Sequence, residues 1–314
     1  MGRNHSKLNL NIKSRYHKFK HSDNSSNSND PPSSIKKFFQ EDFTVIDGRK
    51  YYNIENLHYY LPSDDLEIDR LQLQHYLVRY TWQSNFSSPV RDLLHEGGAR
   101  VLDVGCGPAT WTLEMAFDFQ KCEFIGVDII PMMPLTIKPQ NTDFVEADIL
   151  EGLPFPDDHF DFTFTRFFNA AFPANCWATH AIPGRYVEFM EWDLEACNQG
   201  PLCTRLMSAL AQDLESHEIE INIPKKMGSL LQDTGKLKNI NHEYRDCPLG
   251  KQGGKAGKLA LDNTIFAFKC YASKFSKEFG MTLEEYDAHF DDYIKEVDEY
   301  KTKVRTHRFW AEKI

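Results

Sequence analysis

One stretch, residues 101–112 (VLDVGCGPATWT), limits what this chain can fold into. Three apolar residues, Val101, Leu102 and Val104, predict a buried strand that runs into the glycine turn at residues 105–109, and a helix-compatible run follows. A strand that ends in a glycine turn at a helix N-terminus lets a ligand approach the backbone closely. Because amide groups and the helix dipole face such a ligand, the turn favours an anionic or electron-rich cofactor.

The spacing within the turn separates two kinds of nucleotide cofactor. A dinucleotide site of the G-x-G-x-x-G type needs a third glycine at position 110, where Thr110 stands. The order found is instead Asp103-x-Gly105-x-Gly107. This order resembles the first motif of the class I S-adenosylmethionine (SAM) dependent methyltransferases. The departure is Ala109, where many members of that family carry a third glycine; alanine costs little there if its φ stays negative.

Two further acids follow the motif at the ends of predicted strands. Asp128 ends the run FIGVD (residues 124–128), and Asp148 ends the run FVEAD (residues 144–148). A carboxylate at the first position can accept hydrogen bonds from both ribose hydroxyls, and each such bond contributes roughly 1.5–3 kcal/mol. By the resemblance, Asp148 receives the adenine amino group. The alternative is an α/β domain that carries acids at its strand ends by chance.

The resemblance implies a set of cofactor-binding residues, which lie in these motifs and in one upstream position: Asp103, Gly105, Cys106, Gly107, Asp128, Ile129, Asp148, Ile149, Arg166 and Tyr60. The methyl acceptor is expected beyond the carboxyl ends of the fourth and fifth strands, so the catalytic candidates are Arg166, Asn169 and Glu191. None of the three forms a recognisable catalytic constellation, and the cofactor itself supplies the chemistry. No Asn-Pro-Pro-Tyr-like motif stands at strand four, which disfavours methylation of nucleic-acid bases.

Strand and helix patterns alternate over residues 101–192 and predict an α/β fold. We expect a doubly wound, Rossmann-like, mostly parallel seven-stranded sheet with helices on both faces, plus an N-terminal helical cap and a C-terminal helix. The chain is expected to divide into a disordered basic arm with a Ser/Asn/Pro linker (1–36), a cap segment (37–97), the SAM-binding domain (98–272) and a C-terminal helical extension (273–314).

A helix is predicted to begin after Ser63 as N-cap, with acids in its first turn. One face of it carries Leu66, Arg70, Leu73 and Leu77. The segment YYLPSDDLEIDRLQLQH (residues 59–75) resembles fungal methyltransferases related to the regulators of secondary metabolism. In such enzymes this region packs over the SAM pocket, which makes Tyr60, Arg70 and His75 candidates to close it. The alternative is that Arg70 and His75 only anchor the helix to the core.

The C-terminal segment carries apolar and aromatic residues at alternating spacings of four and three, which predict one stripe along a helix. The stripe consists of Tyr286, Phe290, Tyr293, Val297, Tyr300 and Val304. A helix packed on the domain is the simpler interpretation, and a dimer or coiled-coil surface is the alternative.

Charge and cysteine content exclude several classes of partner. The net charge is −10, although residues 1–22 carry basic residues and no acid. An acidic body argues against nucleic acid, whereas the basic arm suits an anionic membrane or a protein partner. Seven cysteines without a C-x-x-C pair predict a reduced compartment and no metal site. We expect a cytoplasmic or nuclear protein, membrane-associated if Gly2 in the M-G-x-x-x-S start is myristoylated.

The crossover between strands four and five, residues 168–185, is short for a parallel connection. Pro173 and Pro183 leave only residues 174–182 for a helix. Three hypotheses therefore stand. The chain is a SAM-dependent methyltransferase with a small-molecule acceptor, a regulatory methyltransferase-like protein that acts on or binds protein partners, or a SAM-binding pseudoenzyme.

Overall fold

A computed structural model describes residues 43–53, 61–168 and 184–314 of the chain. The basic arm, Tyr60, Asn169 and nearly all of the short crossover were singled out in the sequence and lie outside the described residues. The division of the chain at residues 36, 97 and 272 remains a prediction.

The centre of the molecule is a seven-stranded sheet in the order β5-β4-β3-β6-β7-β9-β8. Its strands are β3 (Arg100–Val104), β4 (Glu123–Asp128), β5 (Thr142–Glu146), β6 (Phe160–Arg166), β7 (Gly184–Trp192), β8 (Leu237–Pro248) and β9 (Lys303–Lys313). The first five pair in parallel, and β9 pairs antiparallel with both β7 and β8. The chain runs outward from β3 to β5 and then restarts at β6 on the other side of β3, which confirms the doubly wound, mostly parallel sheet. Ligands bind such sheets outside the carboxyl ends of the strands at the point of reversal, here between β3 and β6.

Helices cover both faces of the sheet because alternate strand residues point to opposite sides. Val101 packs with α3 (Arg91–Glu96) and α4 (Thr110–Asp118) on one face. Leu102 belongs to the core of the other face, which α7 (Ile223–Asp233) covers. Among the described residues, no helix is long and apolar enough to span a membrane.

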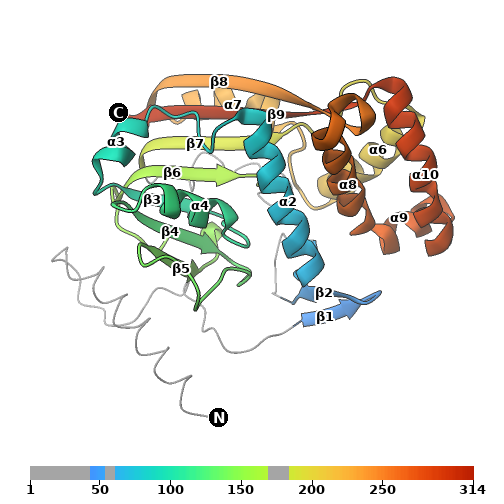
Figure 1. Ribbon diagram of the computed structural model, residues 1–314, viewed down its shortest axis with the longest axis horizontal. Coiled ribbons are helices and arrows are strands. Elements are labelled where there is room, and N and C mark those ends of the chain that lie inside the picture. Colours follow the sequence, from blue (N-terminus) through green and yellow to red (C-terminus); the bar gives the residue numbers. More distant parts are fainter. Residues whose placement is uncertain (1–42, 54–60, 169–183) are drawn as a thin grey trace, which may run out of the picture.

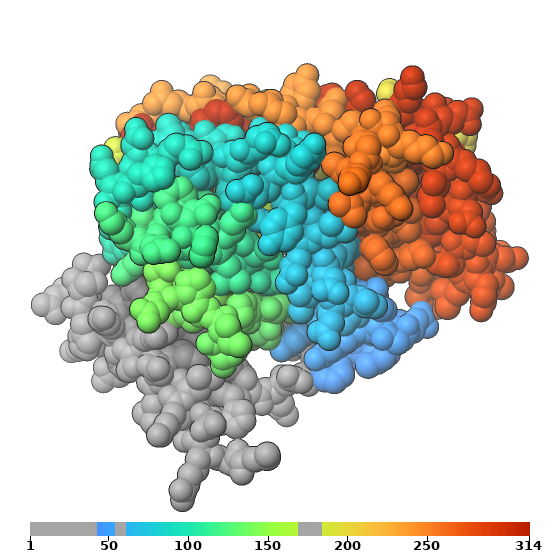
Figure 2. Space-filling model, viewed as in Figure 1, coloured from blue at the N-terminus to red at the C-terminus, as the bar shows by residue number. Residues whose placement is uncertain are grey.

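A second group of helices lies beyond the carboxyl ends of the parallel strands (Figure 1). It comprises α6 (Pro201–Ser216), α8 (Gly254–Lys269, which follows the 3-10 turn η3, Gly250–Gly253), α9 (Ala272–Phe279) and α10 (Leu283–Tyr300). These helices share one hydrophobic core. Figures 1 and 2 show α2 (Asp65–Trp82) between the sheet and this group, so α2 has a partner on each side.

The predicted C-terminal stripe is correct for its first four residues and wrong for its last two. Tyr286, Phe290, Tyr293 and Val297 are buried. Tyr300 is 43% exposed, however, and Lys301 ends the helix in a left-handed conformation with φ of 54°. Val304 belongs to β9, which inserts between β7 and β8. Periodicity within the segment missed this strand because its pairing partners lie far away in the sequence.

The N-terminus of α2 differs from the prediction by one residue. Asp64, and not Ser63, is the N-cap, and its side chain accepts a hydrogen bond from the Glu67 amide. Asp64 also accepts two hydrogen bonds from Arg49, at 2.6 and 2.9 Å. Arg49 lies in the hairpin of β1 (Phe43–Ile46) and β2 (Arg49–Tyr52), so this pair ties the hairpin to α2. The predicted helix face is only partly correct, since Leu66 is exposed.

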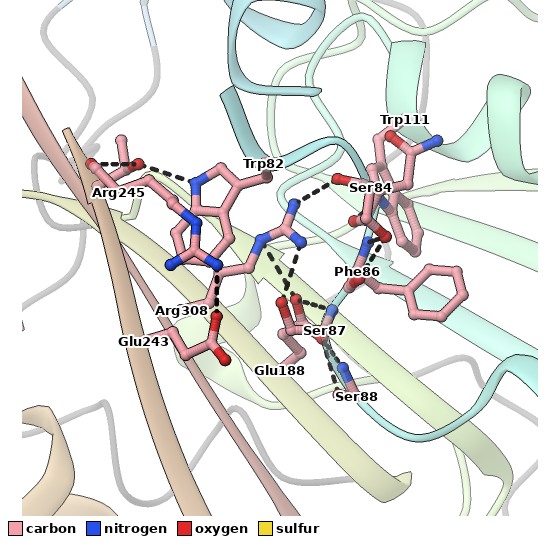
Figure 3. A network of polar contacts seen from close by, with 12 residues as sticks. Trp82, Ser84, Phe86, Ser87, Ser88, Trp111, Glu188, Glu243, Arg245 and Arg308 are labelled. Carbon is pink, nitrogen blue, oxygen red and sulfur yellow. Dashed lines mark hydrogen bonds and ion pairs between the residues drawn. The ribbon is translucent and has the colours of Figure 1, made fainter. Parts of the chain in front are cut away.

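A buried ion pair fixes the chain between α2 and α3 to the sheet (Figure 3). Glu188 on β7 accepts hydrogen bonds from the amides of Ser87 and Ser88 at 2.7–2.9 Å and from the Ser88 hydroxyl at 2.8 Å. Arg308 on β9 lies 3.5 Å from Glu188 and stacks over the Trp82 ring. Burial raises the pKa of Glu188, and Arg308 opposes that rise. The network holds the C-terminal end of α2 over the sheet.

Candidate functional site

The glycine turn between β3 and α4 has the strand–turn–helix geometry predicted from its sequence. Gly105 and Gly107 have φ of 68° and 53°, in the left-handed region that glycine adopts without strain. The amides of Gly105 and Cys106 both donate to the Val127 carbonyl, at 2.7 and 3.1 Å. The turn is therefore fastened to β4, the next strand of the sheet.

Ala109 is the N-cap of α4 and has φ of 61°, contrary to the expectation of a negative φ. The left-handed conformation costs an alanine roughly 1–2 kcal/mol. Two backbone bonds support it: Ala109 donates to the Cys106 carbonyl at 2.8 Å, and its own carbonyl accepts from Leu113 at 2.9 Å. The absent third glycine is therefore a real departure, which the surrounding backbone stabilises.

Asp103 and Asp128 both brace the turn. Asp103 is buried at the end of β3, where it accepts a hydrogen bond from the Thr112 hydroxyl at 2.5 Å, and burial raises its pKa to about 6. Asp128 is the last residue of β4; its two oxygens accept from the Gly107 amide at 2.7 Å and the Ile130 amide at 2.9 Å. Burial raises the pKa of Asp128 as well, and the backbone amides oppose that rise. Asp128 is the less enclosed of the two acids.

The remaining predicted cofactor residues lie along the same edge of the sheet. Cys106 is buried, and burial raises the pKa of its thiol well above the usual value, so the thiol is neutral. Ile129 directly follows Asp128 and is half-buried. Asp148 caps the 3-10 turn η1 (Ile149–Glu151) by accepting from the Leu150 amide at 2.9 Å. Because β4 and β5 are neighbours, the structure brings Asp128 and Asp148 to one edge.

Arg166, at the end of β6, is joined to α2 and α4 through a buried histidine. Its Nη1 lies 3.1 Å from His75 Nδ1, and His75 Nε2 lies 2.6 Å from a Glu114 carboxylate oxygen. Burial, followed by the charges of Arg166 and Arg79, lowers the pKa of His75 to about 3. The imidazole is therefore neutral, accepts from Arg166 and donates to Glu114. His75 anchors α2, as one of the two interpretations of the sequence held.

Phe168 occupies the space directly against Gly105. A Cβ at Gly105 would lie 1.7 Å from Phe168 Cε2, so only glycine allows this contact. The preceding residue, Phe167, has φ of 59°, and the Phe168 amide donates to Glu191 Oε1 at 2.9 Å. Glu191 is fully buried. Glu191, one of the catalytic candidates, thus fixes the backbone that follows β6 through this hydrogen bond.

A cavity of about 190 Å³ lies between α2, α6 and α8. Leu71 belongs to its wall and approaches Gly107, where a Cβ would lie 3.9 Å from Leu71 Cδ1. The wall is mostly apolar and consists of Leu61, Arg70, Leu71, Gln74, Leu77, Val78, Thr81, Phe167, Trp192, Met207, Leu210, Cys247, Ala260, Asn263, Thr264, Ala267, Phe268, Tyr271, Val304 and Thr306. Sequence reasoning missed the α8 contribution, because no local motif marks it.

This arrangement suits SAM better than a metal. The turn with two left-handed glycines and the acids after β4 and β5 provide amide donors and carboxylate acceptors for a nucleoside. Among the described residues, no group of three or more His, Cys, Asp or Glu side chains is placed to hold a metal ion.

Comparison with known proteins agrees with the geometry. Residues 101–180 match a family model described as a methyltransferase domain. A 99-residue stretch is 36% identical to a secondary metabolism regulator, laeA, of Monascus pilosus, covering 31% of this chain and 25% of that protein. A protein-methionine methyltransferase, laeA, of Emericella nidulans is 34% identical over 104 residues, 32% of this chain and 26% of that protein. An N-methyltransferase, verN, of Clonostachys rogersoniana is 25% identical over 277 residues, 81% of this chain and 92% of that protein. The two short matches span about a quarter of each of those laeA proteins. A secondary metabolism regulator, laeA, of Aspergillus fumigatus is 26% identical over 279 residues, 81% of this chain and 73% of that protein.

Proposed function

Since the chain is a SAM-dependent methyltransferase related to the fungal regulators of secondary metabolism, we propose that it methylates a small molecule bound between α2 and α8. One observation carries the proposal: the Leu71 side chain lies both against the glycine turn and in the wall of a mostly apolar cavity. The bound cofactor supplies an electrophilic methyl group on a sulfonium. Held by the glycine turn, Asp128 and Asp148, the cofactor would supply this methyl group to the acceptor, whose O–H or N–H proton would pass to solvent.

The chain's own residues position the two reactants. The glycine turn and Asp128 hold the nucleoside side of the site, with Asp148 beyond them. The neutral His75 holds Arg166 at the end of β6, and the aromatic residues Phe167 and Trp192 border the acceptor cavity. Holding both reactants in line is the main contribution a protein can make to such a methyl transfer.

A protein acceptor is the second candidate. It is favoured by the two laeA proteins that match over about 100 residues, one named a secondary metabolism regulator and the other a protein-methionine methyltransferase. The pseudoenzyme hypothesis rests on residues 168–185, almost all of which lie outside the described residues.

One experiment separates these candidates. The purified chain is incubated with methyl-labelled SAM and with either a small-molecule fraction or a protein fraction of a fungal extract. Label transfer into the small-molecule fraction supports the proposal. Transfer into protein alone supports the second candidate, and SAM binding without transfer to either fraction supports a pseudoenzyme.

A further inference from the structure

The wall of the acceptor cavity carries an uneven set of hydrogen-bonding groups. From it we infer that the acceptor is a neutral, ring-sized molecule with a hydroxyl or amine hydrogen, and that Asn263 selects it. This inference deepens the proposed function and rests on it. A cavity of about 150 Å³ holds one benzene ring, so a cavity of about 190 Å³ suits a single or small fused ring.

Charge within the wall argues for a neutral ligand. No carboxylate is among the described residues of the wall, and Arg70 is its one charged member. The Arg70 guanidinium forms two hydrogen bonds with the buried Glu67 carboxylate, at 2.6 and 2.8 Å. That pair already balances its own charge. An ionised ligand would therefore be buried without a counter-charge, which is strongly unfavourable.

Two threonine hydroxyls of the wall have used their hydrogens on the backbone. Thr81 donates to the Leu77 carbonyl and Thr264 to the Ala260 carbonyl, each at 2.9 Å. A hydroxyl has a single hydrogen to donate, so these two oxygens can only accept a further hydrogen bond. These two oxygens on α2 and α8 can therefore form a further hydrogen bond only with a ligand that carries an N–H or O–H group.

Asn263 is the decisive group because its amide is oriented by the protein. Its Nδ2 donates to the Arg70 carbonyl at 2.8 Å, which fixes the amide relative to α2. Asn263 is only 7% exposed, and its side chain forms no other hydrogen bond with the described residues. A buried amide oxygen that lines a cavity is satisfied best by a donor on the ligand. Gln74 and Tyr271, elsewhere on the wall, can both donate and accept, so they can pair with either the hydrogen or the oxygen of a ligand hydroxyl.

The test uses the full chain saturated with S-adenosylhomocysteine and two probes of nearly equal shape. Indole carries an N–H group and indene does not. By calorimetry, the unmodified protein should bind indole about three- to tenfold more tightly than indene. Asn263→Leu should abolish this preference and leave indene binding within about twofold. The matched control Thr264→Val removes a second acceptor, at the next residue, and the preference should survive this change because Asn263 is the selecting group.

Each outcome bears on the inference. Equal binding of the two probes to the unmodified protein, tighter binding of indene, or binding of neither overturns it, even if Asn263→Leu does not fold. A preference that survives in Asn263→Leu overturns the assignment to Asn263. Binding of S-adenosylhomocysteine is measured first, without probes. Its failure would count against the proposed function, whereas its success with no probe preference would count against the inference alone.

Discussion

Asp128→Asn is the most informative perturbation of the cofactor site, because Asp128 uses each of its oxygens for a different backbone amide. Gly107 donates to Oδ2 and Ile130 to Oδ1. An asparagine keeps one oxygen and replaces the other with NH2, so one amide N–H would face another donor. Losing one charged hydrogen bond costs roughly 1.5–3 kcal/mol. We expect the melting temperature to fall by roughly 3–10 °C.

The same substitution should weaken binding of SAM. A ribose hydroxyl that donates to the carboxylate loses a bond of similar strength, so affinity should fall about tenfold to a hundredfold by calorimetry. Asp128→Ala removes both acceptors and should abolish binding. Asp118→Asn is the control, since Asp118 is an exposed acid at the end of α4 and the charge change is identical. Unchanged affinity in Asp128→Asn and Asp128→Ala would refute the assignment of this acid to the cofactor.

Three further perturbations test the surrounding structure. Phe168→Ala should tighten S-adenosylhomocysteine binding severalfold in calorimetry, because the ring occupies the space that Gly105 leaves open; weaker binding would mean that the ring is part of the cofactor site. Glu188→Ala leaves Arg308 buried without its partner and should lower the free energy of unfolding by about 3–5 kcal/mol in denaturant titrations, whereas a loss below 1 kcal/mol would contradict the role assigned to the pair. The pKa of His75 is about 3 in the folded chain and 6.5 in the unfolded chain. As pH drops between these values, the unfolded chain binds a proton that the folded chain does not, so the free energy of unfolding falls. Relative to His75→Gln, the unmodified chain should lose about 2 kcal/mol more between pH 7 and pH 5; equal losses would show that the histidine is not buried and neutral.

Titration of Asp103 acts in the opposite direction to that of His75. Its pKa is raised from 3.8 to about 6, so the folded chain binds this proton more tightly and loses that stability as pH rises between the two values. The net pH dependence of the unmodified chain therefore mixes both groups. Comparison with His75→Gln, rather than the profile of one protein, isolates the histidine.

The sequence by itself determined the sheet and the cofactor edge. The glycine turn, the strand runs that end at Asp128 and Asp148, and the alternation of strands with helices are local patterns. Local patterns suffice because successive parallel strands bring their carboxyl ends to one edge. That geometry places the turn and both acids side by side without any knowledge of packing.

Tertiary structure alone decided what surrounds that edge. The insertion of β9 into the sheet, the left-handed Ala109 and the position of Phe168 against Gly105 depend on contacts between distant segments. The acceptor cavity depends on them most, since α2, α6, α8 and β9 each supply part of its wall. Asn263 looks like an ordinary helical residue in the sequence. It becomes a candidate selector of the acceptor only because α8 packs against α2 and places this residue in the cavity wall.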